Sequence, residues 1–218
     1  MIAEEYQNSY QPNSSISKGS TVKLIIKSFI ETTPIFKAHI KTFTVKTLNE
    51  EEQTQEFVNI MRRKTQYYPF LIGQEKKDLY HGAKGKPDFY FYSREESEST
   101  ESLFDVEAKR LPSPPPKSRE KEYVIGDKSN GGIERFKNEK HGKGLSECGM
   151  LGFIETEDSN FWLAKINEWL EELSKSNENW VKDETLKEIK NKIVYTYLNS
   201  IVHTISKRDL KLHHFWIK

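Results

Sequence analysis

The sequence predicts an α/β fold in which helices flank a mixed central sheet. Aromatic and β-branched residues dominate two short segments, 86–92 and 103–109, and polar turn residues separate them, so the pair indicates a β-hairpin. A helical pattern with an apolar stripe precedes the hairpin over residues 49–64. A small, apolar run at residues 150–154 is typical of a buried strand. Helices and strands therefore alternate along the chain.

The N-terminal part, residues 1–48, is predicted to be an arm followed by accessory strands. Residues 1–20 are polar and contain Asn, Gln, Ser, Pro and Gly, which is typical of a flexible arm. Residues 21–30 and 35–48 are richer in Val, Ile, Phe and Thr, which favours strands. A helix over residues 22–30 is the alternative.

Residues 49–218 are predicted to form the main domain. Its first helix begins at Asn49, with three glutamates in the first turn and three basic residues near the end, where the helix dipole favours each charge. Phe57, Ile60 and Met61 would form its buried stripe.

The central part of this domain continues with strands and one further helix. A strand at residues 69–73 precedes the hairpin, a helix is predicted over residues 133–140, and the strand at residues 150–154 suits a place beside the hairpin. Cys148 would be an inert core neighbour of that strand. The predicted order is helix, strand, strand, strand, helix, strand.

The C-terminal part is predicted to add two helices and a hairpin. Apolar residues recur at helical spacing over residues 161–173, and Asp183 would cap a lysine-rich helix ending near Val194. Residues 196–205 and 210–217 would pair as a hairpin.

The composition is that of a globular protein without a general attraction to nucleic acid. Charged residues make up 31% of the 218-residue chain and aromatic residues 12%, which excludes a disordered class. Lys plus Arg number 34 against 33 Asp plus Glu, so the net charge is +1. Any positive potential for nucleic acid must therefore be local or supplied by a partner.

Several site classes and compartments are disfavoured by the sequence. Cys148 is the only cysteine, which excludes an internal disulfide and a cysteine-rich zinc site. His213 and His214 are adjacent, so on a strand they face opposite ways and cannot share one metal. No segment has the pattern of a signal peptide or of a membrane span. We therefore expect a cytoplasmic protein with no membrane partner.

The predicted hairpin gathers charged side chains on one face. Alternation along the second strand places Asp105, Glu107 and Lys109 on one side and the apolar residues between them on the other. Pairing of the strands can bring Asp88 beside Glu107. Two neighbouring carboxylates repel each other unless a cation lies between them.

A divalent metal ion, Mg²⁺ or Mn²⁺, fits this place. Asp88 and Glu107 would supply the charge, and the carbonyl of Ala108 is a plausible third ligand. Lys109 would orient the attacking water and stabilise the charge of a pentavalent transition state, which points to phosphodiester hydrolysis. The alternative is a polar strand face on which Glu107 and Lys109 form an ion pair of small worth. Asp105 is either a further ligand or a solvated residue at the strand start; we expect the latter.

The motif Pro87-Asp88 followed by Glu107-Ala108-Lys109 resembles the signature of the PD-(D/E)xK nuclease superfamily. The resemblance implies a restriction-endonuclease-like fold, with Asp88 and Glu107 as metal ligands and Lys109 assisting the attacking water. It implies that the first helix contributes a further acid; Glu52 and Glu56 are the candidates, although a solvated acidic face is the simpler explanation for either. The resemblance covers roughly residues 50–155.

Four residues are candidates for contacts with nucleic acid. Lys86 lies in a glycine-containing basic segment that approaches Asp88, and this segment is either a phosphate contact or an ordinary turn. Gly132 begins a helix whose free N–H groups could hold a phosphate, with Arg135 and Lys137 as basic partners. A hinge before a solvated helix explains the same residues equally well.

The sequence as a whole predicts a metal-dependent endonuclease acting on DNA, with RNA as an alternative substrate. The near-neutral charge and the additions at both ends suggest the nuclease component of a prokaryotic restriction or phage-defence complex, and the composition of complexes purified from the native host decides this. The rival hypothesis is a catalytically inactive binding or assembly subunit with the same fold.

Overall fold

The computed structural model describes residues 18–43, 47–75, 77–95 and 99–218. In these ranges, no helix combines the length and the hydrophobicity that a bilayer crossing requires. The helices are α1 (Lys18–Ile40), α2 (Glu50–Lys64), α3 (Gly132–Lys137) and α4 (Ser159–Ser176), with short 3₁₀ turns at Lys117–Arg119, Asp127–Ser129 and Lys182–Glu184. The strands are β1 (Phe70–Gln74), β2 (Phe89–Ser93), β3 (Ser102–Leu111), β4 (Glu147–Ile154), β5 (Lys187–Asn191), β6 (Tyr195–His203) and β7 (Asp209–Ile217).

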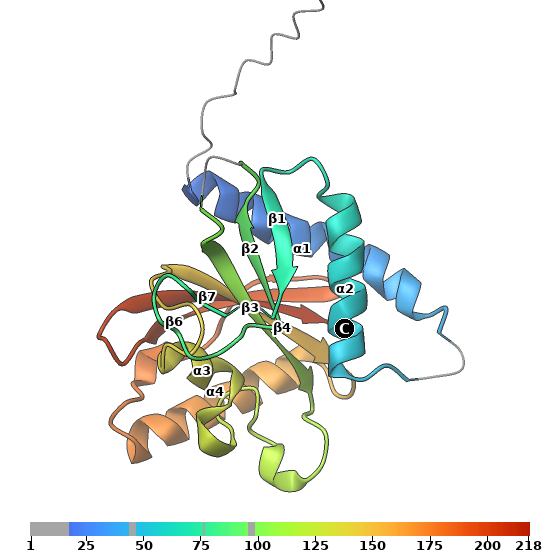
Figure 1. Ribbon diagram of the computed structural model, residues 1–218. Coiled ribbons are helices and arrows are strands. Elements are labelled where there is room, and N and C mark those ends of the chain that lie inside the picture. The colour runs from blue at the N-terminus through green and yellow to red at the C-terminus, as the bar shows by residue number, and fades with distance from the viewer. Residues whose placement is uncertain (1–17, 44–46, 76, 96–98) are drawn as a thin grey trace, which may run out of the picture.

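The strands described here form one mixed seven-stranded sheet in the order β1-β2-β3-β4-β7-β6-β5 (Figure 1). β1, β2 and β3 are antiparallel neighbours, and β3 pairs with β4 in parallel. β4 also pairs in parallel with β7, and β6 and β5 complete the sheet in antiparallel fashion. The predicted C-terminal hairpin is confirmed as β6–β7, but it continues the central sheet and is not a separate addition.

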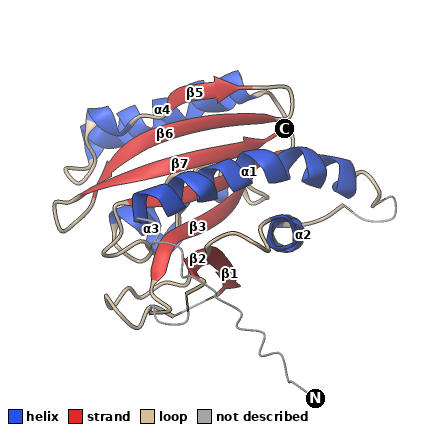
Figure 2. Cartoon of the chain, turned by 90° about the horizontal axis from the view of Figure 1, so that it is seen from above, coloured by secondary structure: helices blue, strands red, loops and turns tan. Residues whose placement is uncertain are grey.

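Helices cover both faces of the sheet, and each face has its own hydrophobic core. α1 and α2 pack on one face, and α3 and α4 on the other; Figure 2 shows α1 and α4 on opposite sides of the strands. The first core is rich in phenylalanine, and the rings of Phe29 and Phe215 stack with centroids 4.1 Å apart. The general α/β architecture with helices flanking a mixed sheet is therefore as predicted.

The predicted N-terminal accessory strands are wrong, because residues 18–40 form helix α1. Val22, Ile25, Phe29 and Phe36 are buried against the sheet at spacings of three, four and seven residues, which is the period of a helix. The β-branched composition favoured a strand, but packing of this stripe on the sheet decides the conformation. The expected alternation at residues 43–46 falls mostly outside the described residues.

The predicted helix over residues 183–194 is also wrong. Lys182–Glu184 form a single 3₁₀ turn, and Lys187–Asn191 form the exposed edge strand β5. The side chain of Asn167 accepts from the backbone N–H of Leu186 and donates to its carbonyl, which fixes an extended backbone just before β5. Lysines are common on edge strands because they discourage pairing with another chain. The lysine-rich pattern was therefore compatible with either structure.

Helix α2 and the central hairpin agree with the sequence. Asn49 caps α2 by accepting from the N–H of Glu52, whose own carboxylate accepts from the N–H of Asn49. β2 and β3 pair with Phe89 opposite Val106, so the backbone position before β2, Asp88, lies at the level of Glu107. The fold thus places both predicted acids at one end of the hairpin.

A buried polar network beneath α3 keeps His214 neutral. Trp216 Nε1 donates to the hydroxyl of Tyr123, which lies 2.9 Å from His214 Nδ1, and Ser200 Oγ lies 3.0 Å from His214 Nε2. Tyr123 therefore donates to Nδ1, and Nε2 carries the proton. Burial, with a smaller contribution from His213, lowers the pKa of His214 to about 3.

The buried His214 predicts a loss of stability in acid. Because the pKa is lowered in the fold, its contribution is complete above the ordinary value of 6.5 and declines as the pH falls from 6.5 toward about 3. Between about pH 6.5 and 5, we expect the free energy of unfolding to fall by about 2 kcal/mol more than in a His214→Gln variant. Urea unfolding of both proteins at the two pH values measures this. Parallel losses in both proteins would contradict it.

Candidate active site

The candidate site lies at the end of β3 that extends beyond its pairing with β2. β2 begins at Phe89, so the last part of β3 has no partner strand on that side. The N–H groups of Ala108 and Arg110 on this open edge are taken by carboxylates. Ala108 donates to Asp88 Oδ2 at 2.6 Å, and Arg110 donates to Glu50 Oε2 at 2.8 Å. The unpaired strand edge therefore holds two acids, one from the loop before β2 and one from the start of α2.

The third acid, Glu107, is fully buried and is surrounded by cationic groups. Its Oε1 accepts from Lys109 Nζ and from Arg135 Nη1, both at 2.7 Å. Its Oε2 lies 3.2 Å from His141 Nε2, but the two groups do not have hydrogen-bond geometry. Within the described part of the chain, this buried oxygen has no hydrogen-bond partner. We call Glu50, Asp88 and Glu107 the carboxylate cluster.

Lys109 places its ammonium group among oxygens of this cluster. Nζ lies 2.7 Å from Glu107 Oε1, 2.9 Å from the carbonyl oxygen of Ala108 and 3.4 Å from Glu50 Oε1. Lys109 is itself buried. These oxygens therefore form a place that accepts positive charge.

Asp88 and Glu107 of the carboxylate cluster have pKa values that are shifted in opposite directions. Burial raises the pKa of Asp88 to about 7, and the charge of Glu107 adds to this effect. Burial alone would raise the pKa of Glu107, but Lys109, His141 and Arg135 outweigh it and lower the pKa to about 2. Burial would lower the pKa of Lys109, but Glu107, Glu50 and Asp88 raise it above its ordinary value. Lys109 is therefore protonated at neutral pH and cannot act as a general base.

The donor set suits a hard divalent cation and not zinc. In the ranges that the structure describes, no three His, Cys, Asp or Glu side chains converge well enough to hold a metal ion by themselves. Mg²⁺ needs only one or two carboxylates, with other oxygens completing its shell. Asp88 and Glu107 provide the carboxylates, the Ala108 carbonyl is adjacent, and Glu107 Oε2 is unpartnered. A groove lined by acids and amides, including Glu50, Glu51, Gln74, Glu75 and Asp88, opens beside them.

The structure brings Asp88, Glu107, Lys109 and Ala108 together as the sequence predicted, while their catalytic roles stay predictions. Sequence reasoning missed Glu50 as a member of the site. The signal was present, because the first helix was expected to supply an acid, but Glu52 and Glu56 were considered instead. Glu52 completes the cap of α2, and Glu56 pairs with His39, so neither joins the site.

Asp105 is not the solvated residue that we expected. It is buried and accepts hydrogen bonds from Ser102 Oγ and from the N–H of Gly142. The predicted shared face of Asp105, Glu107 and Lys109 is correct. Asp105 uses this face to hold the segment after α3 against β3, and both its carboxylate oxygens are occupied.

Two of the four candidate nucleic-acid contacts are buried and already bonded within the fold. Gly132 is buried and its N–H donates to the carbonyl of Glu122, so it offers no donor to a phosphate. Lys137 is buried and pairs with Glu184 on the far side of α3. Arg135 lies at the site, where it binds Glu107. Lys86 is exposed on the loop before Asp88.

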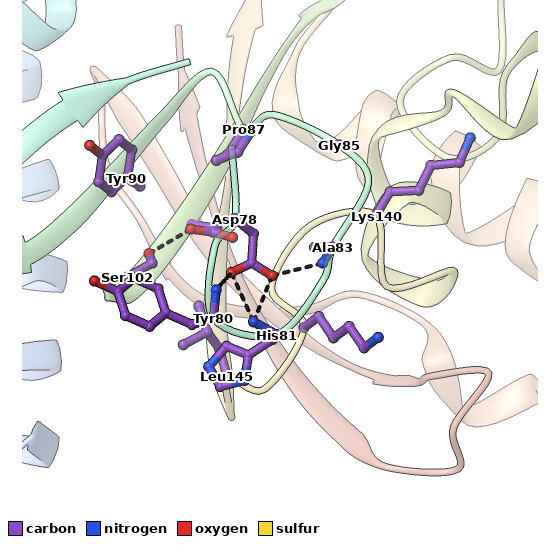
Figure 3. A pocket seen from close by; sticks show the side chains of 12 residues that line it. Asp78, Tyr80, His81, Ala83, Gly85, Pro87, Tyr90, Ser102, Lys140 and Leu145 are labelled. Atoms are coloured by element: carbon purple, nitrogen blue, oxygen red, sulfur yellow. Dashed lines mark hydrogen bonds between the residues drawn. The ribbon is translucent and has the colours of Figure 1, made fainter. Parts of the chain in front are cut away.

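The loop that leads into Asp88 is held together by hydrogen bonds to one of its own side chains. The carboxylate of Asp78 accepts from the N–H groups of Tyr80, His81 and Ala83 at 2.7–3.0 Å (Figure 3). His81 Nε2 lies 2.6 Å from Glu101, and the N–H of Gly85 donates to the carbonyl of Lys140. A small pocket lies under this loop, between Pro87, Tyr90 and Leu145. The backbone that carries Asp88 is therefore tied to both β3 and the segment after α3.

Comparisons with known proteins give no relative for this chain: no protein family, no curated protein and no solved structure matches it.

Proposed function

We propose that this chain is a metal-dependent nuclease with a restriction-endonuclease-like fold, which hydrolyses phosphodiester bonds of DNA. The observation that carries the proposal is the buried Glu107, which has an unpartnered oxygen and lies beside Asp88 and the protonated Lys109. When all three carboxylates are ionised, they outnumber the two cations Lys109 and Arg135, so one negative charge remains beside an open groove. This arrangement attracts a cation and then a phosphate.

Asp88, Glu107 and the Ala108 carbonyl would hold Mg²⁺ or Mn²⁺. The chemistry that such an ion supplies is Lewis-acid polarisation of the scissile phosphate and stabilisation of its developing charge. Asp88, with its raised pKa, is the member of the cluster that gains most from a cation. Glu50 is placed to join the same shell through Oε1, which faces Lys109.

The protein's own groups would position water and stabilise charge. The attacking water would form the new P–O bond and lose its proton to solvent, while the bond to the departing sugar oxygen breaks and that oxygen takes up a proton from solvent. Because Lys109 stays protonated, its role is to donate a hydrogen bond to the water or the phosphate and to stabilise the additional negative charge of the transition state. Arg135, which is partly exposed, would add a second positive charge.

Lys86, on the loop before Asp88, would guide the nucleic acid to the groove. Lys86 and Lys84 are exposed on this loop and lie within four residues of Asp88. Phosphate contacts of this kind orient a duplex without reading its sequence. With a net charge of only +1, binding would depend on such local charge or on a partner subunit.

A cleavage assay tests the proposal. The purified protein is incubated with plasmid DNA, single-stranded DNA and RNA, each with Mg²⁺, with Mn²⁺ and with EDTA. We expect cleavage of DNA that EDTA abolishes and that fresh metal restores. Cleavage in EDTA would contradict the metal requirement, and cleavage of RNA alone would change the substrate. Absence of both cleavage and calorimetric Mn²⁺ binding that depends on Asp88 would favour the inactive binding subunit.

A further inference from the structure

His141 lies beside Glu107, but in the proposed site it holds neither the metal ion nor the attacking water. Its side chain is 1% exposed, and its Nε2 is 3.2 Å from Glu107 Oε2. Nε2 also lies 3.4 Å from Arg135 Nη1, whose nearer partner is Glu107 Oε1 at 2.7 Å. The ring therefore faces the Glu107 oxygen that Lys109 and Arg135 leave without a partner.

The imidazole of His141 is held in place by its surroundings. The ring of Phe136 meets it with centroids 5.7 Å apart and planes at 64°. On the other side, a Cβ on Gly85 would lie 2.6 Å from His141 Cε1 and 2.6 Å from the carbonyl oxygen of Lys140, so this contact requires glycine. Gly85 precedes Asp88 by three residues. His141 thus lies between the loop that carries one acid and the side chain of the other.

The polar atoms of His141 are not used to hold the fold together, unlike those of the two other buried histidines. His213 bonds Tyr197 through Nδ1 and Glu147 through Nε2, and His214 bonds Tyr123 and Ser200. His141 Nδ1 is buried without a hydrogen-bond partner in the described chain, and Nε2 has only two long contacts, with Glu107 Oε2 at 3.2 Å and with Arg135 Nη1 at 3.4 Å. A buried imidazole that is left unsatisfied costs stability, so a role in packing alone would favour an apolar residue.

We propose that His141 is a positioning residue for the metal-binding carboxylate: its Nε2 lies 3.2 Å from Glu107 Oε2, and a small turn of the ring when a cation binds brings the Nε2 proton into line with that oxygen, which fixes the orientation of Glu107 toward Asp88. This inference rests on the proposed metal site. Lys109 and Arg135 hold Oε1, and His141 restrains Oε2, so the carboxylate cannot rotate when a cation binds. Partners of this kind behind a metal ligand commonly change metal affinity by about 10- to 100-fold when they are removed.

The test compares Mn²⁺ binding by calorimetry in the wild-type protein and three variants, without nucleic acid. His141→Leu removes the donor, and His141→Gln restores an N–H donor on a flexible side chain. His213→Leu is the matched control, because His213 is equally buried and bound to a glutamate outside the site. We expect His141→Leu to weaken Mn²⁺ binding by about 10- to 100-fold. His141→Gln should stay near wild type, and His213→Leu should bind Mn²⁺ normally even where it melts at a lower temperature.

Cleavage kinetics add a second readout. Since His141 does not face the groove, His141→Leu should lower kcat at limiting Mn²⁺ and leave KM for DNA unchanged. Equal Mn²⁺ affinity in His141→Leu and wild type would overturn the inference, as would equal weakening in His141→Leu and His141→Gln. Absence of Mn²⁺ binding in the wild-type protein would instead overturn the proposed function, and the positioning role with it. The two failures are therefore distinguishable.

Discussion

Asp88→Asn is expected to abolish cleavage and at the same time to stabilise the metal-free protein. The amide keeps an oxygen to accept from the N–H of Ala108, so the local structure is retained. It removes the charge that repels Glu107 and that a cation needs. We expect cleavage to fall by about 1,000-fold or more, which corresponds to about 4 kcal/mol of activation free energy.

The stabilising effect of Asp88→Asn has a defined pH dependence. The pKa of Asp88 is raised from 3.8 to about 7, so its ionised form costs stability fully above about pH 7. At about pH 8, we expect the variant to be more stable by about 1–2 kcal/mol, allowing for solvent around this partly buried group. The gain should fade as the pH falls from 7 toward 4, where the folded wild-type protein carries a protonated Asp88. Chemical unfolding at both ends of this range measures it, and destabilisation at pH 8 would contradict the assigned repulsion.

Glu107→Gln should also abolish cleavage, but with the opposite effect on stability. Its carboxylate neutralises Lys109 and Arg135, so the amide leaves the buried Lys109 and the partly exposed Arg135 with a weaker partner. Glu147→Gln on the neighbouring strand β4 is the matched control, because Glu147 pairs with His213 and Lys211 away from the site. Full activity in Glu107→Gln, measured below the melting temperature of the variant, would refute the site.

The strand part of the site could be predicted because strand periodicity is local. Alternation along β3 places Asp105, Glu107 and Lys109 on one face, and the hairpin brings Asp88 to the level of Glu107. What lies across from that face could not be derived. Asp105 is buried because the segment after α3 folds over it and donates from Gly142, a contact across 37 residues. His141 and Glu50 reach the site through similar long-range packing, for which a single sequence carries no period.

The fold was predictable where one pattern dominated and failed where two patterns competed. α2 has a cap, a dipole-matched charge distribution and a clear apolar stripe, and all three indicate the same structure. α1 combines a helical stripe with many β-branched residues, so local composition and tertiary packing disagree. β5 is exposed throughout and lysine-rich, so its strand conformation depends on pairing with β6 and on Asn167, not on its own residues.

Lys137 forms a buried ion pair that supports the fold on the face of the sheet covered by α3 and α4. Its Nζ lies 2.5 Å from Glu184 Oε1 and 2.9 Å from the carbonyl of His203, and it lies 4.7 Å above the ring of Trp180. Glu184 also accepts from the N–H of His203, so the pair joins α3, the 3₁₀ turn before β5 and the end of β6. Both side chains are almost fully buried, and neither charge can be left alone without a large desolvation cost.

Lys137→Met is expected to destabilise the protein by about 3–5 kcal/mol, because Glu184 is left as an unpaired buried charge. The double variant Lys137→Met/Glu184→Gln should recover most of this loss, since glutamine removes the charge and still accepts from the N–H of His203. Lys165→Met is the matched control: Lys165 pairs with Glu168 on the exposed face of α4, and its loss should leave the unfolding midpoint unchanged. Urea unfolding of the four proteins decides the matter, and a Lys137→Met midpoint close to that of Lys165→Met would show that the buried pair contributes little.

Because the pair lies away from the carboxylate cluster, folded Lys137→Met should still bind Mn²⁺. This result would separate the role of Lys137 in stability from the contact with nucleic acid that the sequence suggested.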